Sequence, residues 1–184
     1  MRSRIWKDVV DAVAVSTEAD QWFSAFLQMT CRLVHMPATT RRIVDRAYVP
    51  QDRIVGFADG YPLLIIGSGS LLQLNERLHE RGEAAVPMQR FRPNIVIADA
   101  MPHVEDTWKL ARIGSVLVDI VKPCARCVIT TVDVATGLAG HEPLRTLATY
   151  RKVGSKVLFG QNAVHRGLGV IRIGDLVEVV EKGI

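Results

Sequence analysis

The stretch Val121-Lys-Pro-Cys-Ala-Arg-Cys-Val-Ile-Thr-Thr-Val132 holds two of the three cysteines in this sequence of 184 residues. Cys124 and Cys127 lie three positions apart, with Arg126 between them and Lys122 just upstream. Cationic neighbours favour the thiolate form of a cysteine, and a thiolate attacks electrophiles or binds soft metals. The β-branched run after Cys127 predicts a strand. It therefore disfavours a thioredoxin-like motif, in which the first cysteine begins a helix.

Three interpretations of this stretch remain. A structural zinc site needs about four ligands, and only Cys31 and scattered histidines, none at paired spacing, could complete one. Two thiols packed at the end of a strand is the plain structural interpretation. The third is that one thiolate binds a metal that belongs to a cofactor. The stretch alone does not choose among them.

The composition is that of an ordinary globular protein, with 48% hydrophobic and 6% aromatic residues. A net charge of +4 favours anionic partners only mildly, and no Lys/Arg run with interleaved aromatics indicates a nucleic-acid partner. Three cysteines predict a reducing compartment rather than a disulfide framework. No apolar run approaches the length of a membrane span, so we expect a cytoplasmic protein.

The first third of the sequence predicts one loose strand over residues 5–15 and then a helix from Thr17 to about Thr30. A capping-box pattern precedes the aromatic face of this helix, which we expect to lie in the core. A short strand over residues 32–36 follows. The polar, arginine-rich stretch over residues 39–52 predicts a mobile surface segment.

The middle of the sequence predicts an apolar strand over residues 54–67 that is interrupted at Asp59-Gly60. A helix should follow, with Ser70 and Gln73 as its capping box and Gly82 just past its end. Arg90-Phe-Arg-Pro-Asn94 then stands immediately before another strand. Its two arginines offer donors suited to phosphate, although a surface arginine pair at a strand entrance is common.

The last part reads mainly as strands, over residues 108–113, 116–121 and 159–164, with an extended continuation over residues 127–134. A short helix is expected over 144–150, and a hairpin over 170–179 that turns at Gly174-Asp175. Many short strands with three helices that do not alternate with them predict a mainly β, α+β fold. The expected architecture is a closed or nearly closed barrel rather than a doubly wound sheet.

Several motifs stand in one order along the chain: Phe57-Ala-Asp-Gly-Tyr-Pro62, Arg90-Phe-Arg-Pro-Asn94, Asp106-Thr-Trp108, Lys122-Pro-Cys-Ala-Arg-Cys127, Thr130-Thr-Val-Asp133, Glu142-Pro-Leu144, Phe159-Gly-Gln-Asn162 and Ile173-Gly-Asp175. Together they resemble the MOSC family, named after the C-terminal domain of molybdenum cofactor sulfurases. The resemblance is closest to the branch of bacterial N-hydroxylated-base reductases and the mitochondrial amidoxime-reducing component. It implies a β-barrel that binds a molybdenum–molybdopterin cofactor.

The resemblance also implies roles for particular residues. Cys127 matches the cysteine that supplies a thiolate to molybdenum, and Arg92 and Asn94 match positions that hold the pterin and phosphate. Asp59 matches a polar residue beside the metal pocket, where it would share the catalytic role with Cys127. Arg126 would lie against the cofactor. Cys124 is expected to be a packing thiol.

The resemblance further implies that residues 86–184 form the MOSC core. Residues 1–85 would be the C-terminal part of a region that precedes it, with an N-terminal subdomain missing. No cysteine-rich iron–sulfur motif is present, so electrons for the metal are expected from an external electron-transfer protein, either a flavin reductase or an iron–sulfur or haem carrier. We expect neither a nucleic-acid nor a membrane partner.

The function that follows is an oxidoreductase that reduces small N-hydroxylated substrates. One alternative is a sulfur-carrier or cofactor-delivery module with a persulfide on Cys127. MOSC domains fused to pyridoxal-phosphate sulfurases support it, although no pyridoxal lysine site stands out in this sequence. A further alternative is an inactive, truncated MOSC domain.

Overall fold

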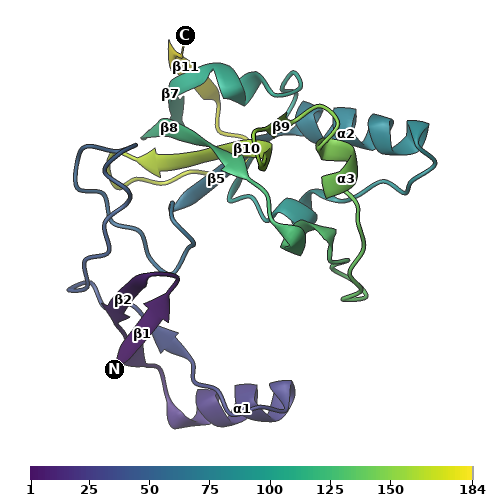
Figure 1. The fold of residues 1–184 in the computed structure, drawn as a ribbon. Coiled ribbons are helices and arrows are strands. Elements are labelled where there is room, and N and C mark those ends of the chain that lie inside the picture. The colour runs from purple at the N-terminus through teal and green to yellow at the C-terminus, as the bar shows by residue number, and fades with distance from the viewer. Residues whose placement is uncertain (184) are drawn as a thin grey trace. The chain divides into compact units, whose positions relative to one another are not determined.

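The computed structural model describes residues 1–183. They form two compact units, an N-terminal unit from Met1 to Tyr61 and a C-terminal unit that begins at Pro62. Figure 1 shows small strands and one helix in the first unit and a curled sheet with helices in the second. The functional division expected between residues 85 and 86 stays a prediction.

The N-terminal unit is built from short pieces. Instead of one strand over residues 5–15, the chain forms a hairpin, because Trp6 adopts a positive φ of 54° and reverses its direction. A second small pair follows the hairpin and brackets the helix. The elements are β1 (Arg2–Ile5), β2 (Asp8–Asp11), β3 (Val13–Ala14), α1 (Thr17–Leu27) and β4 (Val34–His35).

Helix α1 begins where the sequence predicts and ends three residues early. Its N-cap is Ser16, whose hydroxyl accepts from the backbone N–H of Ala19, and its C-cap is Gln28 in the left-handed region. The expectation that its aromatic face is core is wrong. Trp22 is 60% exposed and Phe26 is 71% exposed. Their rings stack on each other with centroids 5.4 Å apart.

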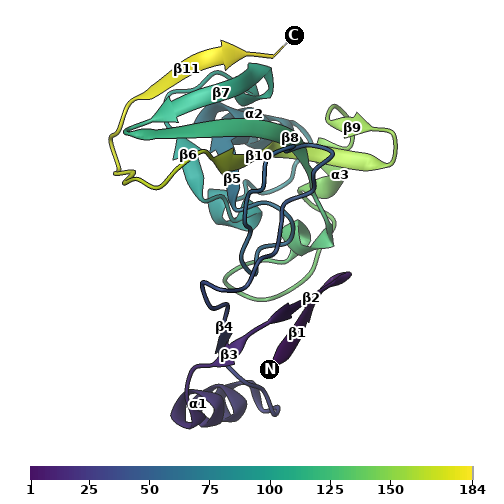
Figure 2. The same cartoon turned by 90° about the vertical axis from the view of Figure 1, so that its left-hand side faces the viewer.

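The C-terminal unit is organised around one sheet of seven strands, in the order β11-β7-β8-β10-β5-β6 with β9 paired to β10. Figure 2 shows the sheet curled like half of a barrel. The predicted class, mainly β with a few helices, is confirmed. Closure into a full barrel stays a prediction. The strands are β5 (Leu63–Gly67), β6 (Ile95–Ile97), β7 (Trp108–Ile113), β8 (Val116–Ala125), β9 (Lys152–Val153), β10 (Lys156–His165) and β11 (Val177–Lys182).

Strand β10 is the common neighbour of β8 and β5. Its Asn162 pairs with Lys122 of β8 on one side and with Leu64 of β5 on the other. The pairing with β8 shifts register between Leu158 and Gln161, around Gly160, which has a φ of 76°. A Cβ added to Gly160 would lie 2.9 Å from the carbonyl oxygen of Ile65. Glycine is therefore required at this bend.

The two faces of the sheet carry separate cores. Ile65 and Ile66 are neighbours in β5 and fully buried, and they belong to different hydrophobic clusters because side chains alternate along a strand. Ile65 packs with Trp108 and Val118. Ile66 packs with Phe91 and Phe159 on the face that receives α2.

The helices of this unit are α2 (Ser68–Glu80), α3 (Leu144–Leu147) and the 3₁₀ turns η1 (Met88–Phe91), η2 (Val104–Thr107) and η3 (Val128–Thr131). The capping box predicted at Ser70 is wrong, because α2 begins at Ser68 with Gly67 as its N-cap and the Ser70 hydroxyl donates to Glu105 instead. Gly82 follows the helix with the predicted positive φ, here 71°.

Two predicted extended segments are also different. Residues 128–131 form η3 rather than a strand, because the hydroxyls of Thr130 and Thr131 donate to the backbone carbonyls of Cys127 and Val128. The hairpin predicted at Gly174-Asp175 does not form. β11 instead pairs with β7, so that Val177 lies opposite Ile113.

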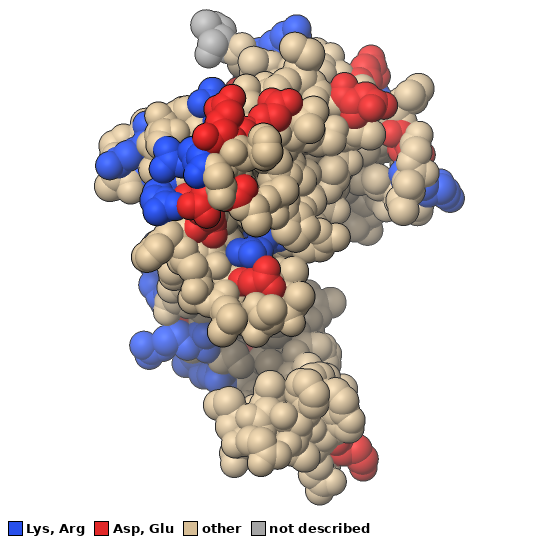
Figure 3. All heavy atoms as spheres, turned by 90° about the vertical axis from the view of Figure 1, so that its right-hand side faces the viewer, with Lys and Arg blue, Asp and Glu red and all other residues tan. Residues whose placement is uncertain are grey.

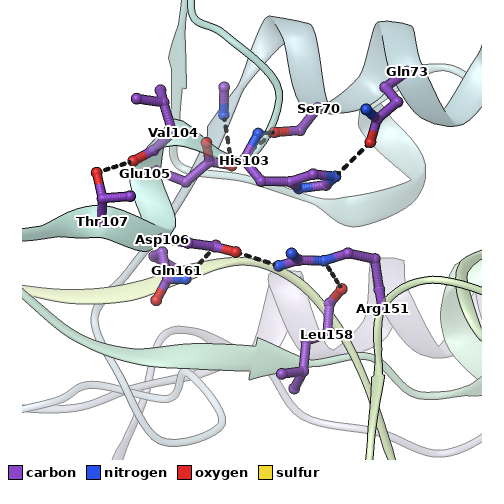
Figure 4. A network of polar contacts seen from close by, with 11 residues as sticks. Ser70, Gln73, His103, Val104, Glu105, Asp106, Thr107, Arg151, Leu158 and Gln161 are labelled. Atoms are coloured by element: carbon purple, nitrogen blue, oxygen red, sulfur yellow. Dashed lines mark hydrogen bonds and ion pairs between the residues drawn. The ribbon is translucent and has the colours of Figure 1, made fainter. Parts of the chain in front are cut away.

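A polar network links the start of α2 to η2 (Figure 4). Glu105 is fully buried, and one of its carboxylate oxygens accepts from the Gly67 backbone N–H at 3.1 Å and from the Ser70 hydroxyl at 3.0 Å. The Ser70 hydroxyl in turn accepts from the backbone N–H of His103 at 2.8 Å. On the opposite side of η2, Asp106 accepts from Arg151.

The imidazole of His103 gives this network a dependence on pH. Burial, followed by the positive charge of Arg151, lowers the pKa of His103 from 6.5 to about 4. Its Nε2 lies 3.1 Å from the Gln73 side-chain oxygen, whereas its Nδ1 is buried and has no partner in the described part of the chain. A second proton would therefore have no acceptor among residues 1–183.

We expect the free energy of unfolding to fall as the pH decreases from about 6.5 to about 4, by roughly 2 kcal/mol after allowing for partial exposure. In that window the unfolded chain binds a proton at His103 and the folded chain does not; above it both forms are neutral and the term vanishes. Urea titrations at pH 7 and pH 4.5 should show a smaller loss for His103→Asn, which tolerates the local positive φ and does not titrate. Equal losses in both proteins would contradict the assignment.

Candidate cofactor site

Arg92 ends η1 in an unusual backbone conformation. Its φ and ψ are 54° and 48°, the left-handed region that residues other than glycine adopt rarely. Its side chain is exposed and has no hydrogen-bond or ion-pair partner among residues 1–183. It borders a pocket of about 480 Å³ lined also by Met88, Gln89, Pro93 and Val96. An unpaired guanidinium at a mainly apolar pocket suits a ligand with an anionic group and a flat body.

Asn94 stands two residues further on, at the entrance of β6. Its side-chain oxygen accepts from the Leu64 N–H at 2.8 Å, and its own N–H donates to the Leu64 carbonyl at 2.9 Å. These bonds attach β6 to β5. The side-chain oxygen therefore serves the fold, and the amide NH₂ is the part of Asn94 that remains for a ligand.

The cysteine stretch follows the end of β8. Cys127 is exposed and precedes η3. Val128 and Ile129 are 64% and 56% exposed, whereas Thr130 and Thr131 are buried. The thiol of Cys127 and the side chains of Val128 and Ile129 therefore face solvent, whereas the two threonines face the interior.

Cys124 is half-buried and is held by Arg126. The guanidinium of Arg126 donates to the Cys124 sulfur at 2.9 Å and to the Phe91 carbonyl at 2.8 Å. It also lies over the Phe91 ring, 5.6 Å from its centroid. Cys124 is thus more than a packing thiol, because its sulfur accepts a charge-assisted hydrogen bond.

Arg90 makes a second link between the same segments. It donates to the Thr130 carbonyl at 3.4 Å and to the Asp133 carboxylate at 2.6 Å, 43 residues away in sequence. Hydrogen bonds from Thr136, then Ala135 and Arg90, hold the pKa of Asp133 below its usual value. Arg90 and Arg126 together fasten η1 against the segment that carries Cys127.

Side chains of opposite charge are interspersed over the face of the C-terminal unit seen in the upper part of Figure 3.

Asp59 belongs to the N-terminal unit, whereas Cys127, Arg92, Asn94 and Arg126 belong to the C-terminal unit. It is exposed and accepts from the indole N–H of Trp6 at 3.1 Å. Its place beside a metal pocket stays a prediction.

The sequence missed the role of Arg42, which stands in the stretch expected to be a mobile surface. Arg42 is only 5% exposed. It forms an ion pair with Asp8 and donates to the backbone carbonyls of Gly56, Ala58 and Asp59. One arginine thus organises the loop that carries Asp59. An arginine in a polar stretch gives no sequence signal for such a role.

Within residues 1–183, no group of three or more His, Cys, Asp or Glu side chains is arranged to hold a metal ion. Among the helices of this part of the chain, none has the length and apolar composition needed to cross a membrane.

Comparisons with known proteins identify the family of this chain. The family model of the MOSC domain matches residues 52–178. The chain is 38% identical over 172 residues to mitochondrial amidoxime-reducing component 1 of Mus musculus, which covers 86% of this chain and 49% of the relative. It is 38% identical over 170 residues to component 1 of Homo sapiens, over 84% of this chain and 49% of the relative. It is 35% identical over 173 residues to component 2 of Rattus norvegicus, over 86% and 50%. The chain spans about half the length of these curated relatives.

Proposed function

Because this chain belongs to the MOSC domain family, we propose that its C-terminal unit binds a molybdenum–molybdopterin cofactor and that the protein reduces N-hydroxylated compounds. The observation that carries the proposal is that Arg92 and Cys127 lie on segments that Arg90 and Arg126 fasten together. The guanidinium of Arg92 has no partner within residues 1–183, and the thiol of Cys127 is exposed. The relatives named amidoxime-reducing components support the reaction class.

The donor set fits such a cofactor. Cys127 would supply a soft thiolate to the metal, which suits a molybdenum already bound by dithiolene sulfurs. Arg92 would hold the phosphate through its planar fork of donors, and the amide of Asn94 would bind the edge of the pterin. Arg126 would lie behind the cofactor.

When bound, the cofactor supplies the two-electron chemistry that removes the hydroxyl oxygen of the substrate. The chain contributes binding and orientation. Arg92 neutralises the anionic end, and Cys127 anchors the metal end. The exposed Val128 and Ile129 provide an apolar margin next to the thiol. Electrons would come from an external flavin reductase or an iron–sulfur or haem carrier, and the cytoplasm stays the expected compartment.

The experiment that tests this function is metal analysis and pterin fluorescence of the purified chain. Molybdenum near one equivalent together with pterin supports the proposal, whereas a chain free of both after expression in a cofactor-producing host contradicts it. The exposure of Cys127 also suits a persulfide carrier. A sulfane-sulfur assay on the same sample separates the two functions, because only the carrier retains labile sulfur without molybdenum.

Replacing Arg92 with alanine should weaken binding of isolated cofactor by roughly ten- to a hundredfold, since a hydrogen bond to a charged group contributes about 1.5–3 kcal/mol. Lysine should restore only part of the affinity, because it keeps the charge and loses the fork. Fluorescence titration of wild type, Arg92→Ala and Arg92→Lys measures this. Three equal affinities would mean that Arg92 is a surface charge.

A further inference from the structure

We propose that Arg126 is a positioning residue that fixes Arg92 relative to the cysteine stretch, with the Cys124 sulfur as its anchor. The inference rests on the proposed function, because it concerns how the two ends of that site are kept at one spacing. It assigns to Cys124 a role that neither a packing thiol nor a metal ligand has.

The first step is the reach of the Arg126 guanidinium. One terminal nitrogen donates to Cys124 at the end of β8, and the other donates to the Phe91 carbonyl of η1, 35 residues away in sequence. Both terminal nitrogens of Arg126 thus bind protein groups, and its Nε is buried without a partner among residues 1–183. The exposed guanidinium of Arg92 is therefore the better placed of the two for a ligand.

The second step concerns the peptide bond between Phe91 and Arg92. Its carbonyl oxygen accepts from Arg126 at 2.8 Å, and its N–H donates to the Gln89 carbonyl at 3.1 Å. Both polar atoms of this peptide are therefore held, so its plane cannot rotate freely. The left-handed backbone of Arg92 is intrinsically unfavourable and persists only where neighbouring bonds enforce it. Arg126 supplies one of those bonds.

The third step is the anchor. One terminal nitrogen of the Arg126 guanidinium holds the Phe91 carbonyl, and the Cys124 sulfur holds the other. Arg126 therefore connects the thiol-bearing stretch directly to the backbone that aims Arg92. A serine at position 124 would keep an acceptor, whereas an alanine would remove it.

The first test needs no cofactor. The cofactor-free chain is alkylated with iodoacetamide, and tryptic mass spectrometry follows Cys124 and Cys127 separately, since cleavage after residue 126 divides them. In Arg126→Lys we expect Cys124 to react at least about fivefold faster, because lysine cannot cover the sulfur and reach Phe91 together. We expect the rate of Cys127 to stay within about twofold, because that exposed thiol keeps its cationic neighbour. Arg112→Lys, which changes an exposed arginine of β7, is the control and should leave both rates unchanged.

The second test is a binding cycle with isolated molybdenum cofactor. Arg126→Lys should lower the affinity by about tenfold. In the Arg92→Ala background the same change should cost less than about threefold, because a residue that acts through Arg92 has little effect once Arg92 is gone. A purely structural role would give additive losses. Cys124→Ser should retain more of the affinity than Cys124→Ala.

Unchanged alkylation of Cys124 in Arg126→Lys would overturn the proposal, because the contact would not exist in solution. Additive losses in the binding cycle would also overturn it, since Arg126 would then act independently of Arg92. A chain whose wild type binds no cofactor would contradict the proposed function, and the alkylation test would still decide whether the Cys124–Arg126 contact forms.

Discussion

Replacing Cys127 with alanine is expected to abolish molybdenum retention and N-hydroxylated-substrate reduction while leaving the fold intact. The thiol is exposed, and its segment is held by the backbone carbonyl that accepts from Thr130 rather than by the sulfur. Removing the sulfur therefore costs little stability and takes away the one protein ligand proposed for the metal.

The measurement is molybdenum content per chain by inductively coupled plasma mass spectrometry, with circular dichroism to verify the fold. Cys31→Ala is the matched control, because Cys31 lies in the N-terminal unit and should leave the metal content unchanged. Cys127→Ser should also lose molybdenum, since a hydroxyl is a harder and weaker ligand for it than a thiolate. Full metal content in Cys127→Ala would remove the basis for this residue as the metal ligand.

The second large effect concerns Glu105. We expect Glu105→Ala to lower the free energy of unfolding by about 3 kcal/mol or more, because it leaves the buried Gly67 N–H without an acceptor and opens a cavity. The Ser70 hydroxyl loses its acceptor as well. Gln at this position keeps one acceptor oxygen and should cost less.

Urea denaturation monitored at Trp108 measures this loss, in a background where Trp6 and Trp22 are phenylalanine. Trp108 is 8% exposed and lies in the C-terminal unit, so its fluorescence reports on the unit that contains Glu105. The control is Glu181→Ala, which removes an exposed carboxylate paired with Lys109 and should cost less than about 1 kcal/mol. A loss for Glu105→Ala as small as that of the control would contradict the role of Glu105 in the network.

Regular apolar patterns predicted several elements. The strands at residues 108–113 and 116–121 and the helix before Gly82 carry such patterns and are present, as is the strand predicted at 159–164. Where side chains compete with the backbone, propensity failed. The β-branched run after Cys127 predicted a strand, yet two threonine hydroxyls turn it into η3. The hairpin predicted over residues 170–179 was wrong for another reason. The strand that begins at Val177, β11, pairs with the distant β7 and not with the residues just before it.

The candidate site was predictable as a set of residues and not as an arrangement. The motifs point to Cys127, Arg92 and Asn94. Nothing in them distinguishes an arginine that binds protein groups from one that is unpartnered, since that depends on contacts across 35 or more residues. Likewise, no pattern marks Arg42 as buried or Arg92 as left-handed. These properties arise only when the chain is folded.

Strand β10 has a consequence for how such a protein can change over time. Asn162 of this strand pairs with Lys122, two residues before Cys124, and with Leu64, whose backbone binds Asn94. The strand therefore fixes the spacing between β8 and β5. Losing or gaining one residue within β10 would offset β8 relative to β5 by about 3.3 Å. It would also turn every following side chain of β10 to the other face of the sheet. The chemistry of its side chains can vary under packing constraints alone. The length of β10 is therefore constrained. Insertions and deletions should occur in the loops at its ends and not within the strand.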